Sequence, residues 1–202
     1  MISAIVLAAG ESKRMGQTKQ LLDWEGRTIL QRVLENLSRS RVDEVILVLG
    51  HEADRILQAL DTHQAKVVIN KNYKAGMITS IQQGLINLND KVEAFFIVLA
   101  DQPAVGPEIF DRLISEFRRV TPQKNIVLPA FRGRRGHPAL FSGKYRKEAL
   151  RIEGDVGFRQ VLQEHPEEIL TVEMETDSIL QDIDTPDDYR KQLKTNFPGK
   201  DP

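Results

Sequence analysis

Short apolar runs alternate with amphipathic segments along the first 130 residues of the chain. The apolar runs show no regular polar alternation, which is typical of parallel strands buried on both faces of a sheet. They predict strands at Ile2–Ala8, Val45–Leu49, Lys66–Ile69, Ala94–Ala100 and Asn125–Pro129. The segments between them predict helices at Thr28–Leu37, Ala53–Leu60, Ser80–Leu88 and Pro107–Val120. This order indicates an α/β fold in which helices cover both faces of a mostly parallel sheet.

The pattern becomes less regular after residue 130. It predicts two further strands at Pro138–Phe141 and Leu170–Met174, and a helix at Asp155–Gln163. A last helix is expected to begin at Thr185-Pro186, because a threonine cap followed by proline and two acidic residues is typical of a helix start. We therefore expect a single three-layer α/β/α domain over residues 1–195, followed by a tail at 196–202.

Composition narrows the class of protein. The chain has 202 residues and a net charge of −1, without the basic excess of a nucleic-acid-binding protein. It has no cysteine, which excludes disulfides, thiolate zinc sites and cysteine nucleophiles. No apolar run approaches the roughly 18 residues of a membrane-spanning helix, and the apolar N-terminus lacks a basic leader. We expect a cytoplasmic protein that binds neither nucleic acid nor membrane.

The stretch LAAGESKRMGQTK follows the first predicted strand, where open α/β sheets bind ligands. Its small residues would let backbone N–H groups approach a ligand closely, and Arg14 and Lys19 would donate charge-assisted bonds to phosphate oxygens. The spacing of its glycines fits neither a Walker loop nor the dinucleotide fingerprint. The stretch predicts another kind of phosphate or nucleotide loop; a strand–helix turn with solvated cations is the alternative.

Two acidic segments are candidates for a metal site. Asp101 follows the most apolar strand, and Mg²⁺ bound to nucleotide phosphates takes one or two protein carboxylates. Asp182 and Asp184 are expected on one face of a late strand, with Asp184 at its end. The alternatives are that Asp101 only starts a turn before proline, and that Asp184 only tightens the turn into the last helix.

Two other loops carry candidate contacts. Gly76 and Ser80 precede a predicted helix, where exposed N–H groups and hydroxyls suit a base or ribose, although a capped loop is equally consistent. The run RGRRG at 132–136 and His137 could hold a phosphate on an acceptor, or form a solvated cluster of charge.

The motif Leu-Ala-Ala-Gly-x-Ser-x-Arg-Met-Gly-x-x-Lys at residues 7–19 resembles the signature of nucleotidyltransferases with a GT-A-like fold. Within them it is most similar to the molybdenum cofactor cytidylyltransferase (MocA-like) family. The runs LADQP at 99–103, DIDTP at 182–186, GHP at 136–138 and GDVGFR at 154–159 are also similar to motifs of that family. The resemblance implies a Rossmann-like fold, with a nucleotide-binding half at about 1–105 and an acceptor-binding half at about 106–195.

The resemblance also implies a reaction: Mg²⁺-dependent transfer of CMP from CTP to a molybdopterin-type cofactor, with release of pyrophosphate. Lys19, Arg14 and Asp101 would be catalytic, and Asp101 and Asp184 would hold Mg²⁺. Nucleotide contacts would come from Leu7, Ala8, Ala9, Gly10, Arg14, Lys19, Gly76, Ser80 and Asp101. Acceptor contacts would come from Arg135, Gly136, His137 and Asp155.

Ala9 favours cytidine, because guanylyl-transferring relatives commonly have glycine at that place. A molybdenum hydroxylase is a further expected partner. The alternatives are transfer from GTP, another acceptor such as a sugar or polyol phosphate, and a non-catalytic chaperone that carries the cofactor to hydroxylases.

Overall fold

The computed structural model describes residues 1–62, 65–154 and 158–197 of the chain. Strand β1 (Ile2–Ala8) lies inside a mixed sheet. Its neighbours are β6 (Ala94–Leu99) and β4 (Glu44–Leu49), both parallel to it, and β5 (Lys66–Ile69) completes that side. On the other side follow β9 (Ala139–Ser142), β7 (Ile126–Phe131) and β10 (Ile169–Glu173), with the short β8 (Arg134–Arg135) beside β7. Among the described strands, β9 and β8 run antiparallel to their neighbours, so the sheet is mostly parallel, as predicted.

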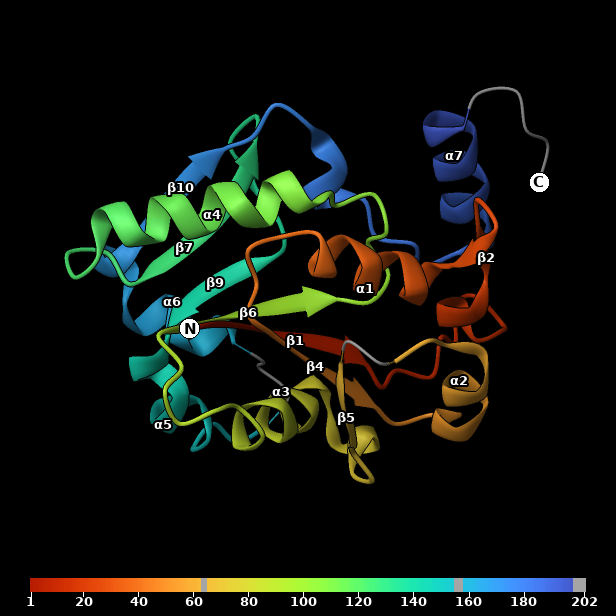
Figure 1. Ribbon diagram of the computed structural model, residues 1–202, viewed down its shortest axis with the longest axis horizontal. Helices are drawn as coiled ribbons and strands as arrows, with labels where there is room; N and C mark the ends of the chain where they lie inside the picture. Colours follow the sequence, from red (N-terminus) through yellow and green to blue (C-terminus); the bar gives the residue numbers. More distant parts are fainter. Residues whose placement is uncertain (63–64, 155–157, 198–202) are drawn as a thin grey trace.

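Helices cover both faces of this sheet (Figure 1). One face packs against α1 (Ile29–Ser38) and α4 (Pro107–Val120), and the other against α3 (Met77–Ile86), α5 (Arg146–Ala149) and α6 (Arg159–Glu164). Strand β1 serves both cores, because Ala4 and Val6 point to the first face and Ile5 to the second. This arrangement confirms the three-layer α/β/α fold.

The observed elements follow the predicted ones closely where a long apolar pattern defines them. The strands Ile2–Ala8 and Lys66–Ile69 and the helix Pro107–Val120 have the expected bounds. Helix α3 begins at Met77, three residues before the expected Ser80, because Gly76 turns the chain with a φ of 110°. Part of the predicted helix at Asp155–Gln163 lies outside the described residues, and its observed part is α6.

The late strand expected around Asp182 and Asp184 is wrong. Residues 177–180 form a 3₁₀ turn (η5, Asp177–Leu180), and residues 181–184 have no regular secondary structure. The backbone N–H of Ile183 bonds to the Asp101 carbonyl instead of to a neighbouring strand. Residues 181–184 therefore lie beside the end of β6.

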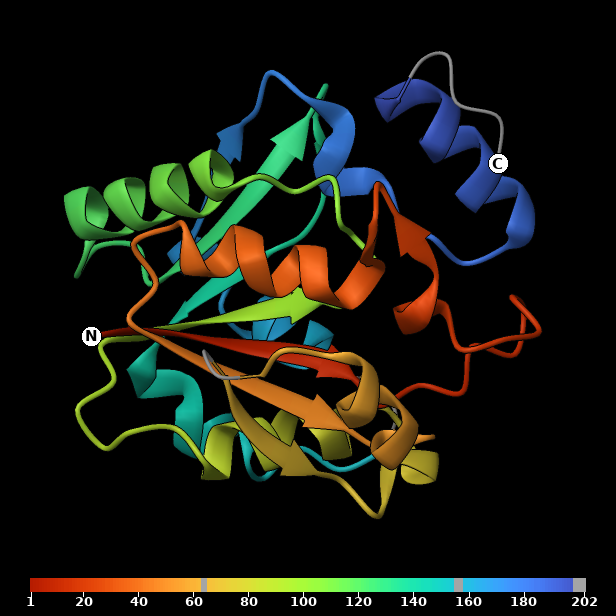
Figure 2. The ribbon, with the colours of Figure 1, turned by 45° about the vertical axis from the view of Figure 1, so that its right-hand side comes forward.

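The last helix, α7 (Pro186–Asn196), begins where predicted and has a complete capping box. Thr185 accepts from the backbone of Asp188, whose side chain accepts from the backbone of Thr185 in return. A small cluster joins α7 to the N-terminal loop and to the hairpin of β2 (Asp23–Trp24) and β3 (Arg27–Thr28); its buried members are Met15, Trp24, Ile29 and Ile183. Figure 2 shows α7 beside this red N-terminal segment.

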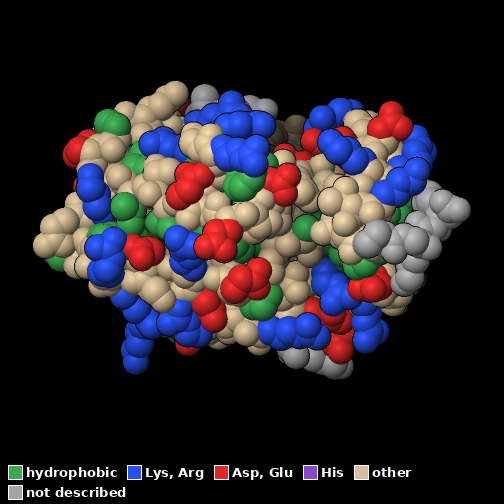
Figure 3. All heavy atoms as spheres, turned by 90° about the horizontal axis from the view of Figure 1, so that it is seen from above, with side chains coloured by type: hydrophobic (Ala, Val, Ile, Leu, Met, Phe, Trp, Pro, Cys, Tyr) green, Lys and Arg blue, Asp and Glu red, His purple; other side chains and the backbone are tan. Residues whose placement is uncertain are grey.

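Helix α2 (Ala53–Ala59) lies near the end of β4. In the described ranges, no helix has the length and apolar character needed to cross a membrane. On the face drawn in Figure 3, acidic and basic side chains are interspersed, in keeping with the near-neutral net charge.

Candidate active site

The site lies at the carboxyl ends of β1 and β6. These strands are parallel, and Leu7 pairs with Leu99, so the loops that follow them leave the sheet side by side. Ligands in open α/β sheets bind at this edge. The fold thereby brings the cationic loop and Asp101 together, although they are far apart in sequence.

Loop 8–19 holds the backbone of Lys19 in place. The carbonyl of Ser12 accepts from Met15 and Gly16, and the hydroxyl of Ser12 accepts from the N–H of Lys19 at 3.3 Å. The buried amide of Gln20 donates to the carbonyl of Ala8 at 3.4 Å. The loop is therefore a closed turn that begins the 3₁₀ helix η1 (Lys19–Leu21).

Lys19 bridges two carboxylates. Its Nζ contacts Oδ2 of Asp101 and lies 3.0 Å from Oδ1 of Asp184. The other oxygen of Asp184 is 2.8 Å from the guanidinium of Arg14, whose side chain is 70% exposed. The Lys19 and Asp101 side chains are each only 15% exposed. The structure thus joins the three residues that the sequence assigned to catalysis with the second acid that it assigned to metal.

The electrostatics follow from this crowding. Burial alone would lower the pKa of Lys19, but Asp101 and then Asp184 outweigh it and raise that pKa. Desolvation, followed by the negative charge of Asp101, raises the pKa of the Asp182 carboxyl. The ammonium of Lys19 is therefore held in its charged form between the acids.

The acidic groups fit a divalent cation. Oδ1 of Asp101 is buried and has no hydrogen-bond partner among the described residues. An unpaired buried carboxylate oxygen is costly, and oxygen atoms of this kind are the ligands that Mg²⁺ prefers. Asp101 and Asp184 could therefore hold such an ion.

The small residues of the loop leave backbone open near this cluster. Ala8 and Ala9 are buried, whereas Leu7 is partly exposed and Gly10 is exposed. A Cβ on Gly10 would meet no atom within 4 Å, so a ligand could approach its backbone. The backbone of Ala9 is held in place, because its carbonyl accepts from the backbone N–H of His51 at 3.1 Å.

Gly76 and Ser80 lie at the start of α3, after β5. The hydroxyl of Ser80 is buried and accepts from the amide of Asn70 at 2.9 Å. Asn70 also donates to Thr79, at the same distance. Ser80 therefore supports this loop through Asn70, a residue that the sequence reasoning did not select.

The acceptor candidates divide between an exposed hairpin and the site. Arg135 is exposed on β8, beyond a turn in which Arg132 and Gly133 have positive φ. Gly136 packs tightly, because a Cβ there would lie 2.2 Å from the carbonyl oxygen of Ile179. Asp155 lies outside the described residues.

His137 extends the site on the acceptor side. The backbone N–H of His137 donates to the Ile179 carbonyl at 3.0 Å. Its ring nitrogen Nδ1 is buried and has no hydrogen-bond partner in the described parts of the chain. Burial lowers the pKa of His137, against the opposing charge of Asp101. A neutral imidazole with a free ring nitrogen can bind a polar ligand group.

Gln102 was not selected as a part of the site, and Asp182 was considered only as an acid beside Asp184. The buried amide of Gln102 donates to Oδ1 of Asp182 at 2.7 Å and to the carbonyl of Ile179 at 3.3 Å. These bonds attach the segment that carries Asp184 to the end of β6. Gln102 directly follows Asp101 and lies in the run LADQP, but nothing in the sequence pairs it with Asp182.

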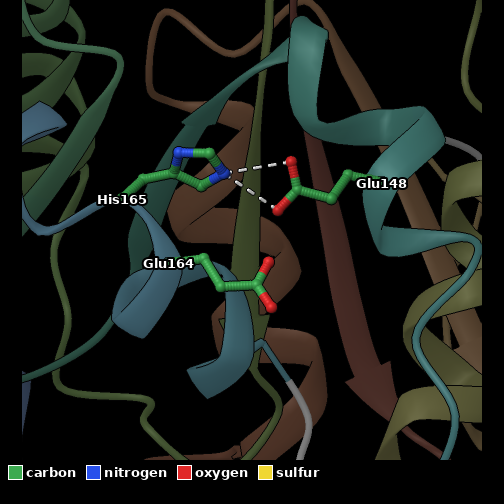
Figure 4. A group of neighbouring side chains, drawn as sticks. All are labelled: Glu148, Glu164 and His165. Carbon is green, nitrogen blue, oxygen red and sulfur yellow. Dashed lines mark hydrogen bonds and ion pairs between the residues drawn. The ribbon is translucent and has the colours of Figure 1, made fainter.

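Another group of possible metal ligands comprises Glu148, Glu164 and His165 (Figure 4). It lies by α5 and α6, at the edge where β10 begins, opposite the carboxyl ends that carry Lys19 and Asp101. Nε2 of His165 is 3.1 Å from both oxygens of Glu148, while Glu164 is exposed. We assign this group to local pairing between α5 and the end of α6.

Comparison with known proteins matches residues 4–169 to the MobA-like NTP transferase domain. The chain is 31% identical to the molybdenum cofactor cytidylyltransferase of Escherichia coli K12, over 93% of each chain. It is 36% identical to a probable molybdenum cofactor guanylyltransferase of Methanosarcina acetivorans, over 75% of this chain and 67% of the relative. It is also 29% identical to nicotine blue oxidoreductase of Paenarthrobacter nicotinovorans, over 91% and 92%.

Among solved structures, the chain resembles the Rv0371c protein of Mycobacterium tuberculosis H37Rv in complex with manganese. The TM-score is 0.78 at 28% identity, and the match covers 96% of this chain and 98% of the other. The family match covers most of the sequence, from residue 4 to residue 169. The chain therefore belongs to the MobA-like NTP transferase family and is a nucleotidyltransferase related to the molybdenum cofactor cytidylyl- and guanylyltransferases.

Proposed function

We propose that this protein transfers CMP from CTP to a molybdopterin-type molybdenum cofactor in a Mg²⁺-dependent reaction. The observation that carries the proposal is the cluster in which Lys19 and Arg14 meet Asp101 and Asp184, on the loop that also carries the open backbone of Gly10. Two cations and two carboxylates at one strand edge suit a triphosphate with its metal ion. The similarity to the cytidylyltransferase of Escherichia coli supports the choice of acceptor.

The reaction is a single in-line displacement. A phosphate oxygen of the cofactor attacks the α-phosphorus of CTP, and the bond from that phosphorus to the bridging oxygen breaks. Pyrophosphate leaves with the electron pair, and the product is the cytosine dinucleotide of the cofactor. A phosphomonoester is largely ionised near neutral pH, so the attack needs no strong general base.

Lys19 and Arg14 would stabilise the negative charge that develops on the leaving group. Lys19 is suited to this role because Asp101 and Asp184 raise its pKa, so that its ammonium is charged before a nucleotide binds. Asp101 and Asp184 would hold Mg²⁺, which neutralises phosphate charge when it is bound. Positioning and electrostatics then supply most of the rate.

The acceptor would bind between the end of β6 and the hairpin of β7 and β8. His137 would contact it, Gly136 would keep the backbone close to Ile179, and Arg135 would attract its phosphate. Asp155 is proposed as a further contact on the basis of the motif alone. Delivery of the product to a molybdenum hydroxylase in the cytoplasm completes the proposal.

Cytidine is proposed over guanine because of Ala9. Its side chain is 5% exposed, and its Cβ lies 2.9 Å from where a Cβ on Gly50 would be. The methyl group of Ala9 therefore fills space between the ends of β1 and β4. Guanylyl-transferring relatives commonly have glycine there, which leaves more room beside the nucleotide.

Oxidation or reduction, which the name of the nicotine blue oxidoreductase states for that relative, would not need this cluster. A redox reaction requires neither a lysine held between two acids nor a free carboxylate oxygen. Nucleotidyl transfer uses all of these groups. We therefore propose transfer chemistry for this chain.

The test follows pyrophosphate release from purified protein with Mg²⁺, molybdenum cofactor and each of the four nucleoside triphosphates. We expect release with CTP that requires the cofactor and is lost in Asp101→Asn. Release only with GTP would replace the nucleotide, and release only with a sugar or polyol phosphate would replace the acceptor. Absence of release under every condition, with cofactor still bound, would instead support the chaperone alternative.

A further inference from the structure

Three of the four carboxylate oxygens of Asp101 and Asp184 are already paired with the chain's own cations. Lys19 takes Oδ2 of Asp101 and, at 3.0 Å, Oδ1 of Asp184, while Arg14 takes Oδ2 of Asp184 at 2.8 Å. Of the four oxygens, Oδ1 of Asp101 has no hydrogen-bond partner among the described residues. The nucleotide-free site is therefore balanced by a lysine and an arginine.

A metal ion and the Lys19 ammonium cannot share these oxygens. Mg²⁺ binds carboxylate oxygen at about 2.0–2.1 Å in near-octahedral geometry. The Nζ of Lys19 lies between the two acids and would be within repulsive reach of an ion that contacted both. An ion held by both Asp101 and Asp184 must consequently displace Lys19.

Displacement is unfavourable unless Lys19 gains another partner. Its side chain is 15% exposed, and removing the partner of a buried charge costs far more than breaking a surface pair. The backbone of Lys19 is held by Ser12, but its flexible four-carbon stem can swing. Phosphate oxygens placed over the open backbone of Gly10 would give it a new anionic partner.

We propose that Lys19 and Arg14 are resident counter-ions of Asp101 and Asp184, which a divalent cation replaces only when a nucleoside triphosphate draws them away. The site then binds metal and nucleotide as one unit and holds free metal weakly. This inference rests on the proposed function in that it takes Asp101 and Asp184 as metal ligands. It does not depend on which acceptor is used.

The test measures Mn²⁺ affinity by electron paramagnetic resonance in protein without nucleotide or acceptor. We expect Lys19→Met to bind free Mn²⁺ about tenfold more tightly than wild type, although the same change should strongly reduce turnover. A non-hydrolysable CTP analogue should raise the Mn²⁺ affinity of wild type by about 5- to 150-fold, the usual range of coupling between two ligands. In Lys19→Met that increase should shrink.

Three matched variants make the result specific. Lys19→Arg keeps the charge and should keep the weak affinity, and Lys13→Met should change nothing because Lys13 is 81% exposed and pairs with Glu11. Asp101→Asn combined with Lys19→Met should lose the tight binding. Lys19→Gln serves as a second substitution if Lys19→Met does not fold, and thermal unfolding checks each protein.

Equal or weaker Mn²⁺ binding by folded Lys19→Met would overturn the inference. So would tight binding that survives in the double variant, because the ion would then lie elsewhere. Coupling with a GTP analogue in place of CTP would support the inference while contradicting the proposed nucleotide. Failure of CMP transfer with the coupling intact would contradict only the proposed function.

Discussion

The side-chain amide of Gln102 donates a 2.7 Å hydrogen bond to the carboxylate of Asp182, across 80 positions of sequence. The same amide donates to the carbonyl of Ile179, and Ile183 bonds to the carbonyl of Asp101. The segment that carries Asp184 is thus attached to the end of β6 by side chain and backbone. Gln102 is a positioning residue for the carboxylate cluster.

Gln102→Leu should lower turnover by about tenfold or more, within the range typical of outer partners of a metal site. The substitution removes both bonds of a buried amide and should cost about 1–3 kcal/mol of stability. Turnover and Mn²⁺ affinity should fall together, which a purely structural role would not produce. Gln123→Leu, at an exposed position, is the control, and normal metal affinity in folded Gln102→Leu would contradict the assignment.

Lys19→Met and Asp101→Asn should each reduce nucleotidyl transfer by about 10²–10³-fold or more, the usual cost of removing a charged group that stabilises a transition state. Steady-state pyrophosphate release measures the effect. Lys13→Met should retain normal turnover, since this lysine lies on the same loop but is largely solvated. Near-normal rates in either site variant would remove that residue from the mechanism.

Gly136→Ala should destabilise the protein by about 1–3 kcal/mol, as expected for overpacking against a rigid neighbour. The new Cβ would lie 2.2 Å from the carbonyl oxygen of Ile179, and backbone cannot move aside as a flexible side chain does. Urea unfolding measures the change. Gly10→Ala is the matched control because its Cβ would meet no atom within 4 Å, so equal losses in both variants would contradict the packing argument.

Stability should fall in acid partly because of Asp188. Hydrogen bonds from Thr185 lower the pKa of the Asp188 carboxyl below its usual range. Its contribution is therefore fully present above the unfolded-state pKa of about 3.9 and is lost as pH falls through the lower folded-state pKa. We expect Asp188→Asn to have a lower Tm than wild type at pH 6 and a smaller difference at pH 2.5, measured by circular dichroism. A difference that stays constant with pH would contradict this.

The central strands and the longest helix could be predicted because the apolar pattern that leads to their burial lies within one contiguous stretch of sequence. Ile2–Ala8 is buried almost throughout, and α4 has a proline start and one continuous apolar stripe. The two-residue strands β2, β3 and β8 are too short to show a period. Thr28 and Gln31 have the spacing typical of a capping box, but only half of it forms: Thr28 accepts from the N–H of Gln31, whereas the Gln31 side chain accepts from the backbone N–H of Asp61.

The site shows the same division. The sequence pointed to Lys19, Asp101 and Asp184, because small residues, cations and acids at strand ends carry a chemical meaning of their own, and the fold joins them. The hydrogen bond between Gln102 and Asp182 could not be predicted from the sequence, since an amide and a carboxylate 80 positions apart give no local signal. The assumed strand at 182–184 failed because contacts from β6 determine that backbone.

The ion pair between Lys19 and Asp184 has a consequence for the synthesis of this protein on the ribosome. Ribosomes release a chain from its N-terminus, so Lys19 and Asp101 emerge well before the stretch that completes their pocket. The helix that packs on Met15 and Trp24 begins later still, at Pro186. A nascent polypeptide can therefore build most of the sheet while remaining inert, and competence arrives only after the stretch that carries Asp184 has been released.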